Sequence, residues 1–298
     1  MKKVLSLLAI SVISLTTLCG CSQGGEQNGD NDTESRAFDT SKKITVVTRE
    51  EGAGLRGVVA DLFGFLRKET EGDNTDLTFE GAAVRESADE IRTAVADDKY
   101  AISYLPLTSV TDKVKALKVN GVAPSAANVK NGNYSFKHKL VAVTTTETGE
   151  VAQDFLNFVL SEEGQNILMD NGYISNGDTG AFTTKKPEGT LEISAASSSE
   201  PAIKNLCEEY KKLNDKLKIE ITKENSKDAI DGVDEKDDIA FITRTLSDKE
   251  KETHKENTVC EDAIAVVVNK ENTLSNITSE QVRSIYKGET TKWSEIIK

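Results

Sequence analysis

The segment KITVVTREEGAGLRGVVADLFGF, residues 43–65, sets the pattern of the folded chain. Its first part, Ile44 to Thr48, is a β-branched apolar run that predicts a strand. A turn with two glycines follows, and apolar residues then recur at helical spacing from Leu55 to Leu66. The segment therefore predicts a strand, a tight loop and a helix.

The loop between this strand and this helix has the composition of an anion site. Unpaired backbone N–H groups at a helix start attract negative charge, and Gly52 and Gly54 let a ligand approach the main chain. Arg49, directly before the loop, adds a planar cation that can bind an oxyanion through two hydrogen bonds. We expect a small oxyanion here, although glycine loops before helices also occur as simple turns.

The loop REEGAGLR, residues 49–56, resembles that of the phosphate-binding proteins that serve bacterial phosphate ABC transporters. Residues 101–134 resemble a further segment of the same family, and so does AQDFLNFVLSEEGQNILMDNGYI at 152–174. In that family these segments form the later part of the chain, whereas here they come first.

The second half of the chain resembles the opening part of the same family. The matching segments are SAASSSEPAIKNLCEEY at 194–210, NSKDAI at 225–230, DIAFITRTLSDKE at 238–250 and residues 260–296, which end in KGETTKWSEI. Since each family segment occurs once and the order is exchanged, we interpret the chain as circularly permuted; a remnant of a tandem arrangement is the alternative. Permutation predicts that Lys298 lies near Lys43 in one lobe.

The resemblance implies an α/β fold of the type II periplasmic-binding architecture, with two lobes of mixed sheet flanked by helices. We expect lobe A to be split between residues 43–134 and 273–298, and lobe B to run from 135 to 272. Ligands of such folds lie outside strand ends near helix starts, so the cleft between the lobes is the expected site.

The resemblance also implies a set of oxyanion-binding residues, with some departures from the family pattern. Ala53 and Leu55 stand where the family usually has serine and threonine hydroxyls, and Arg244 cannot accept a proton from a ligand as an aspartate there does. Phosphate itself is therefore in question. The residues implied are Arg49, Gly52, Ala53, Gly54, Leu55, Ser198, Ser199, Ser226, Thr243 and Arg244.

The N-terminus has the features of an export signal. A basic start precedes the apolar run Val4 to Leu18, and Leu18-Cys19-Gly20-Cys21 fits a lipoprotein processing site with Cys21 as the lipidated residue. A plain secretory signal or a short anchor helix is the alternative. We predict a signal peptide at 1–20 and a polar, disordered tether at 21–42 that leads to an extracytoplasmic body on the membrane.

Composition narrows the classes of partner. The formal charge of −13 argues against nucleic acid and against an anionic membrane surface. Cys207 and Cys260 either pair or remain as two buried thiols, and no metal spacing, cofactor motif or nucleophile–base pair is visible.

The sequence thus predicts a monomeric, lipid-anchored solute-binding protein for phosphate or a related oxyanion, which feeds an ABC transporter permease. The alternative is a surface sensor or interaction module that keeps the fold and has lost the ligand. An enzyme ranks third.

Overall fold

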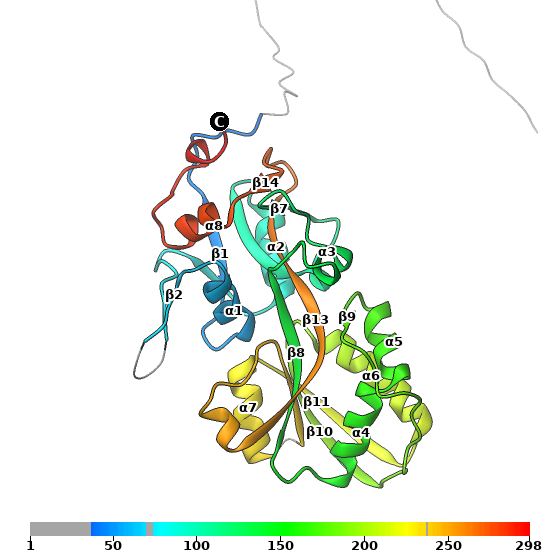
Figure 1. Cartoon of the computed structure of the whole chain (residues 1–298). Coiled ribbons are helices and arrows are strands. Elements are labelled where there is room, and N and C mark those ends of the chain that lie inside the picture. The colour runs from blue at the N-terminus through cyan, green and yellow to red at the C-terminus, as the bar shows by residue number, and fades with distance from the viewer. Residues whose placement is uncertain (1–36, 70–73, 237) are drawn as a thin grey trace, which may run out of the picture. The chain divides into compact units, whose positions relative to one another are not determined.

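The structure is a computed structural model that describes residues 37–69, 74–236 and 238–298. Residues from Phe38 to Lys298 form one compact unit of α/β type (Figure 1). The predicted signal peptide and lipidation site lie outside the described residues. In the part of the chain that is described, no helix is both long and apolar enough to cross a membrane.

One mixed sheet extends through this unit, with strands in the order β11-β10-β12-β8-β13-β5-β1-β4. Short strands β6 (Val114–Ala116) and β9 (Ile174–Ser175) also pair with β13. Two small separate pairs are β2 (Leu66–Arg67) with β3 (Thr75–Asp76) and β7 (Lys118–Val119) with β14 (Asn276–Ile277). The main strands are β1 (Thr45–Arg49), β4 (Ala83–Arg85), β5 (Ala101–Pro106), β8 (Lys137–Thr145), β10 (Gly189–Ala196), β11 (Leu217–Glu224), β12 (Ile239–Ile242) and β13 (His254–Asn269).

Helices cover the sheet in two groups. The first group is α1 (Gly54–Leu62), α2 (Ala88–Asp97), α3 (Ala126–Lys130) and α8 (Ser279–Tyr286). The second group is α4 (Glu150–Leu160), α5 (Glu162–Asp170), α6 (Glu200–Leu213) and α7 (Ser226–Glu235). Short 3-10 turns are η1 (Leu107–Ser109), η2 (Glu250–Glu252) and η3 (Trp293–Glu295).

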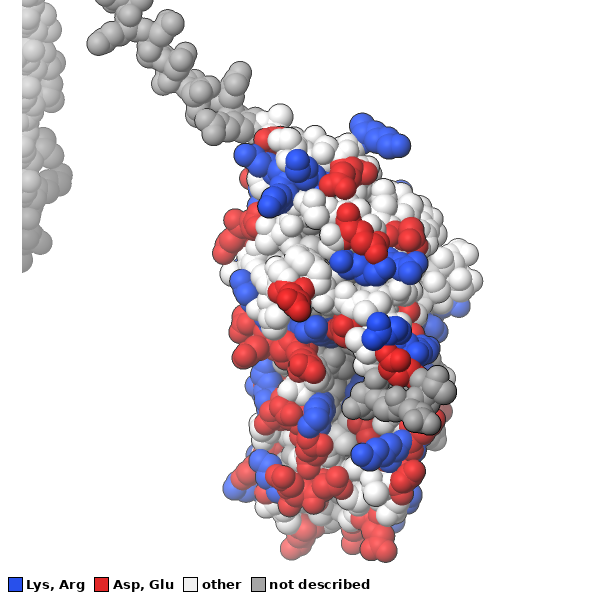
Figure 2. Space-filling model, turned by 90° about the vertical axis from the view of Figure 1, so that its left-hand side faces the viewer, with Lys and Arg blue, Asp and Glu red and all other residues white. Residues whose placement is uncertain are grey.

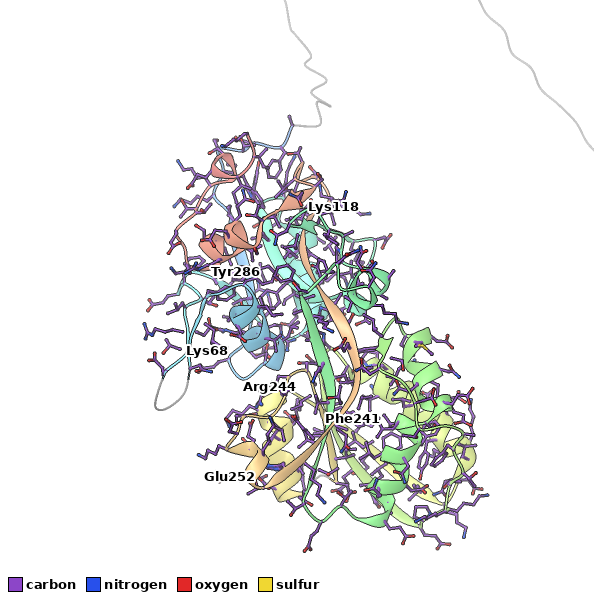
Figure 3. All side chains as sticks on the ribbon, in the orientation of Figure 1. Lys68, Lys118, Phe241, Arg244, Glu252 and Tyr286 are labelled. Carbon is purple, nitrogen blue, oxygen red and sulfur yellow. The ribbon has the colours of Figure 1, made fainter. Side chains whose placement is uncertain are left out.

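The hydrophobic cores divide the unit into two halves. In the half that contains β1 and β5, one core includes Leu55, Tyr286 and Trp293, and another on the opposite sheet face includes Ile91. In the half that contains β10 and β12, the two cores are built around Phe155 with Phe241, and around α7. We call these the β1 half and the β10 half. Figure 3 labels Tyr286 in the first and Phe241 in the second.

Two long antiparallel strands, β8 and β13, join the halves (Figure 1). Phe136, just before β8, packs in a core of the β1 half, whereas Leu140 packs in the β10 half. Likewise Cys260 of β13 belongs to the β10 half and Ile264 to the β1 half. Residues 138 and 262, which face each other in the ladder, lie where both strands change core.

The two ends of the unit lie together, as the permuted order predicts. The backbone N–H of Ile44 donates to Thr291 O at 2.8 Å, and the backbones of Lys43 and Lys292 form an isolated antiparallel β-bridge. The Tyr286 hydroxyl donates to Val47 O at 3.0 Å. Figure 1 places the C-terminus beside the first described residues.

The tether prediction was wrong at its C-terminal end. The ring of Phe38 packs against Trp293 at 5.7 Å between centroids, and the N–H of Ser294 donates to Thr40 O at 2.6 Å. Residues 38–42 therefore belong to the folded unit, because an aromatic side chain anchors them to it.

Helix ends also differ from the periodic pattern. The helix predicted to reach Leu66 ends at Leu62, because Gly64 adopts a φ of 78° that stops it. The amphipathic pattern from Val151 to Asn171 favours one helix, but the structure has two there, since Ser161 caps the start of α5 by accepting a hydrogen bond from Gly164 N. Apolar periodicity continues across that break, so the pattern alone did not reveal it.

Candidate functional site

Four strand ends bring the candidate residues together. Arg49 ends β1, Ser197 follows β10, Ser226 follows β11 and Thr243 follows β12. Strand β10 pairs in parallel with both β11 and β12, so their carboxyl ends lie at one edge of the sheet. This edge is where open α/β sheets bind ligands.

Arg49 is the buried cation of this site, with 3 % of its surface exposed. Its Nε and Nη2 each donate to the Glu50 carboxylate at 2.7 Å. Nη2 also lies 3.1 Å from Glu86 O and 3.0 Å from the Ser197 hydroxyl. The bond to Ser197 crosses from the β1 half to the β10 half, so Arg49 occupies the junction of the two.

The predicted glycine loop packs directly against the other half. A Cβ on Gly54 would lie 2.5 Å from Ser226 Oγ and 3.0 Å from Thr243 Oγ1, so only glycine fits there. Gly52 has a φ of 86°, and its carbonyl accepts from Lys227 N at 3.3 Å. The start of α1 and the start of α7 therefore meet in this closed arrangement.

The hydroxyls of Ser226 and Thr243 form the opposite wall. Thr243 N donates to Ser226 Oγ at 3.2 Å, and the two side-chain oxygens are 3.4 Å apart. Both residues are almost fully buried. Asn225 caps α7 through its side-chain oxygen, which accepts from Lys227 N and Asp228 N. These groups provide neutral donors beside Arg49 and the start of α1, a combination suited to an oxyanion.

A cavity of about 460 Å³ opens beside Arg49 and is mainly acidic. Its charged lining consists of Glu50, Glu86, Glu90, Glu224 and Asp228 with one cation, Lys223. On the face shown in Figure 2, acidic and basic side chains are interspersed, without a broad basic area. Long-range attraction of an anion therefore does not come from this surface, and the short-range donors must provide it.

The structure places Ala53 and Leu55 differently from one another. Ala53 is the N-cap residue of α1 and makes no side-chain cap hydrogen bond. Leu55 is 1 % exposed and packs in a core of the β1 half. Leu55 can therefore contribute its backbone N–H to the site, but its side chain belongs to the core.

The serine turn is arranged differently from the prediction. The Ser199 hydroxyl donates to Ala196 O at 2.9 Å, which closes the turn before α6. Ser198 lines a separate cavity with Arg92 and Tyr173. Ser197, which the sequence analysis left out, makes the contact with Arg49.

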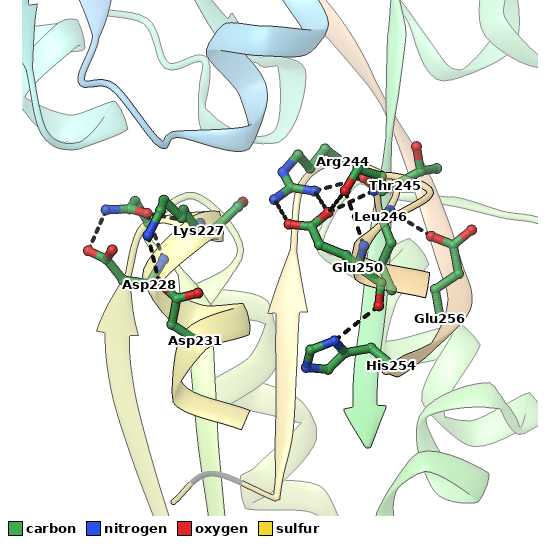
Figure 4. Close-up of polar contacts among 12 residues, drawn as sticks. Lys227, Asp228, Asp231, Arg244, Thr245, Leu246, Glu250, His254 and Glu256 are labelled. Carbon is green, nitrogen blue, oxygen red and sulfur yellow. Dashed lines mark hydrogen bonds and ion pairs between the residues drawn. The ribbon is translucent and has the colours of Figure 1, made fainter. Parts of the chain in front are cut away.

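Arg244 is bound to a carboxylate on its own side of the cleft (Figure 4). Its Nη1 and Nη2 donate to Glu250 at 2.8 and 2.6 Å. Burial alone would raise the pKa of Glu250, but hydrogen bonds from Arg244 and Ser247 lower it to about 2. Arg244 thus holds the η2 turn beside the site. Figure 4 also shows Lys227 paired with Asp231.

Cys207 and Cys260 are buried free thiols, so of the two states predicted for them the unpaired one is present. Burial raises the pKa of Cys207 to about 12. Among the described residues no group of His, Cys, Asp and Glu side chains could hold a metal ion. Besides Ser197, Glu50 was not predicted as a partner of Arg49, because its only signal in the sequence is that it is adjacent to Arg49.

Known proteins resemble this chain over its whole length. A family profile described as "PBP superfamily domain" matches residues 180–297. Phosphate-binding protein PstS 2 of Streptococcus agalactiae is 35% identical over 300 residues, which are 99% of each chain. Phosphate-binding protein PstS 2 of Streptococcus pneumoniae is 32% identical over 299 residues, again 99% of each.

A shorter match and a solved structure add to these. Phosphate-binding protein PstS of Bacillus subtilis is 33% identical over 135 residues, 45% of this chain and 42% of that one. The crystal structure of a phosphate-binding protein of a phosphate ABC transporter from S. pneumoniae is similar with a TM-score of 0.69. That likeness has 32% identity and covers 85% of this chain and 99% of the other. The resemblance first seen in residues 49–56 and 260–296 is confirmed, and this chain belongs to the PstS family of phosphate-binding proteins, within the PBP superfamily.

Proposed function

We propose that this chain is a lipid-anchored, extracytoplasmic solute-binding protein that captures phosphate or a related oxyanion and delivers it to an ABC transporter permease. The observation that carries the proposal is the position of Arg49, buried at the junction of the halves and bonded to Ser197 across it. Its relatives are named phosphate-binding proteins, which supports phosphate as the ligand.

The oxyanion would bind between two helix starts. Backbone N–H groups at Gly54 and Leu55 and the hydroxyls of Ser226, Thr243 and Ser197 would donate to it, with Arg49 as the charged partner. The halves would open about β8 and β13 to admit the ligand and close on it by hinge motion.

The location of the protein is part of the same proposal. Cys21 would carry the lipid, and the polar residues after it would hold the folded body away from the membrane. The protein would act as a monomer, because one chain provides both sides of the cleft.

The lobes are proposed as the permuted order suggests, with 43–134 and 273–298 in lobe A and 135–272 in lobe B. The match to B. subtilis PstS over less than half of each chain supports a permutation, since a colinear alignment of permuted chains covers one part at a time. The full-length matches to the streptococcal proteins indicate that those relatives share this order.

A second candidate is a surface sensor or interaction module without a transported ligand. Glu50 favours it, because its carboxylate already fills the side of the Arg49 guanidinium formed by Nε and Nη2. The side chain of Leu55 in the core favours it as well, since no hydroxyl is present there.

Calorimetry on protein that starts at Phe38 distinguishes these functions. We expect phosphate to bind to the native sequence and Arg49→Ala to abolish binding. Arg85→Ala, which removes a partly exposed arginine from β4, is the matched control. Failure of the native protein to bind phosphate, sulfate or arsenate at millimolar concentration would replace the transport function with the interaction module.

A further inference from the structure

A buried histidine and a buried carboxyl group face each other between the halves. His138 of β8 and Asp262 of β13 are partners in the ladder, at the position where both strands pass from one core to the other. Their side chains are each about 1% exposed. Any bending of the halves about β8 and β13 must act on this pair.

The hydrogen bonds to the pair come from the β1 half. Thr108, in the η1 turn of the β1 half, donates its N–H and its hydroxyl to Asp262 Oδ2 at 3.2 and 2.6 Å. The same oxygen lies 3.9 Å from His138 Nε2. Neither His138 Nε2 nor Asp262 Oδ1 has a hydrogen-bond partner among the described residues. Two buried polar atoms without partners carry a free-energy cost unless a proton or a small movement satisfies them.

The state of the histidine ring follows from its other nitrogen. His138 Nδ1 lies 3.4 Å from Lys139 O, and a carbonyl oxygen only accepts, so Nδ1 carries the proton of the neutral ring. Nε2 is then an acceptor that faces the carboxyl group. When Asp262 is ionised, two acceptors face each other, namely its carboxylate and His138 Nε2. When Asp262 binds a proton, its carboxyl group becomes a donor to Nε2.

We propose that His138 and Asp262 form a one-proton latch in the hinge, so that protonation of the pair favours the closed cleft and its loss favours opening. The inference does not depend on which anion the cleft binds. Opening bends β8 and β13 at the pair and admits water to it, and water stabilises the ionised carboxylate.

Burial sets the working range of the latch. Burial raises the pKa of Asp262 to about 7, although the bonds from Thr108 oppose the rise. Burial lowers the pKa of His138 to about 4. In the closed form the proton therefore resides on Asp262 up to neutral pH.

Other charged and ionisable groups lie beside the pair. On β8 and β13, Lys137 pairs with Glu261 at 2.7 Å. Burial raises the pKa of Tyr173 and of Cys260. Lys139 is exposed on β8. The latch is thus expected to titrate as a unit near neutrality.

The pH dependence of unfolding gives a distinctive signature of such a pair. Between about pH 4 and pH 6.5 the native pair holds one proton on Asp262, and the unfolded chain holds one on His138. The pair then adds no slope to the stability of the native protein. Replacing Asp262 removes the proton that the native state binds, and replacing His138 removes the proton that the unfolded chain binds.

The unfolding constants of the two variants should therefore change with pH in opposite directions, each compared with the native protein. In Asp262→Asn, relative to the native protein, the unfolding constant should fall by up to about tenfold per pH unit as pH rises from 4 to 6.5, because only the unfolded histidine is protonated. In His138→Gln it should rise by up to about tenfold per unit from pH 4 to 7, because only the native carboxyl group is protonated. Asp234→Asn, which disrupts the partly exposed pair with His254, is the matched control.

Opening itself can be followed by fluorescence energy transfer. Dyes on Lys68→Cys and Glu252→Cys label the two halves on one side of the molecule (Figure 3), and Cys207 and Cys260 are buried. The protein begins at Phe38 and is free of ligand, so the result does not depend on phosphate binding. We expect transfer to decrease between about pH 5.5 and about pH 8 in the native sequence and in Asp234→Asn, but not in Asp262→Asn.

Parallel stability profiles for Asp262→Asn and His138→Gln would overturn the latch. The latch would also be overturned if the stability profiles are opposite but energy transfer is the same at about pH 5.5 and about pH 8. The pair would then affect stability without affecting opening. If Asp262→Asn does not fold, His138→Gln against the native protein still tests the proton count.

Discussion

The guanidinium Nη2 of Arg49 lies 3.0 Å from the hydroxyl of Ser197, and this bond links the end of β1 to the end of β10. The two residues are far apart in the sequence and belong to different halves of the fold. The contact places the buried cation at the junction of the halves, where a ligand can hold both together. Glu50, adjacent in the chain, competes for the same guanidinium.

Replacement of Glu50 by glutamine should strengthen oxyanion binding. The carboxylate takes two charge-assisted hydrogen bonds from Arg49, and it repels an anion that approaches from the acidic cavity. Loss of one competing charge should raise phosphate affinity about tenfold or more, as judged from hydrogen bonds to charged groups. Titration calorimetry with Glu50→Gln, and with Glu51→Gln on the exposed side of the loop as control, measures this. Weaker binding in Glu50→Gln would instead identify Glu50 as a residue that positions Arg49.

Single replacements at Ala53 and Leu55 should have opposite effects on stability. Ser is a better N-cap than Ala, so Ala53→Ser should stabilise the native state by about 1 kcal/mol and add a hydroxyl beside the site. Leu55→Thr removes apolar contacts and buries a hydroxyl in the core, at a cost of about 2–4 kcal/mol.

Urea unfolding of both variants, with Val58→Thr on the partly exposed face of α1 as a control, tests this difference. The resemblance to the family suggests that hydroxyls at both positions would add hydrogen bonds to phosphate. The burial of Leu55 now restricts that expectation to Ala53→Ser. Unchanged stability of Leu55→Thr would show that position 55 faces the cleft.

The bond between Arg244 and Glu250 should make stability depend on pH in the acid range. Since the pKa of Glu250 is lowered to about 2 from an ordinary 4.5, its contribution is complete above pH 4.5 and is lost as pH falls towards 2. Glu250→Gln should destabilise the protein at neutral pH by about 1–3 kcal/mol, and the difference should vanish near pH 2. Unfolding curves at several pH values, with exposed Glu252→Gln as control, give the comparison. A difference that persists unchanged in acid would exclude the ion pair as its cause.

Cys21→Ser should release the protein from the membrane fraction without unfolding it. If Cys21 carries the lipid as proposed, the serine variant lacks the thiol that the lipid needs, whereas the compact unit begins at Phe38. Fractionation of cells that express each form, with circular dichroism of the released protein, provides the measurement. Persistent membrane association of the serine variant would leave the anchor-helix alternative.

Sequence patterns identified the strands and helices that carry strong periodicity. Ile44 to Thr48 and His138 to Thr144 are β-branched apolar runs, and both form buried strands. The β2–β3 pair was missed because each strand has only 2 residues, and Arg67, Thr75 and Asp76 are polar. The polar residues from His254 to Glu256 give no strand pattern, so the first part of β13 was not predicted, although the ladder with β8 includes it.

The sequence predicted which main-chain segments meet at the site, but not how each side chain is oriented there. Arg49, Gly54 and Ser226 meet because strand ends and helix starts fix the main chain, which the pattern reveals. The choice among Ser197, Ser198 and Ser199 depends on the turn geometry before α6, and three consecutive serines do not reveal which hydroxyl faces Arg49. Nor does sequence show that Leu55 points inward, since helical spacing fits both a core face and a cleft face.

A chain with the order of its two parts exchanged should fold to the same structure. The ends already run side by side, with Trp293 N donating to Lys42 O at 3.2 Å, so a short glycine–serine linker can join Lys298 to Phe38. New ends between Gly177 and Asp178 fall in an exposed loop, and the new N-terminal end stays attached because Thr179 N donates to Leu160 O at 3.0 Å and Gly180 O accepts from Glu162 N at 2.9 Å. The linked chain should match the parent in free energy of unfolding to within about 2 kcal/mol and keep its anion affinity, because closing a short loop between adjacent ends costs little.

A control with ends inside α4, between Asn157 and Phe158, should fail to fold, because it cuts a helix whose Phe155 and Phe158 lie in the core. Chemical unfolding and calorimetry on the three chains decide the matter. If the chain opened at Gly177 is as unstable as the one opened in α4, the ends are not equivalent to a loop, and circular permutation does not explain the exchanged order of the family segments.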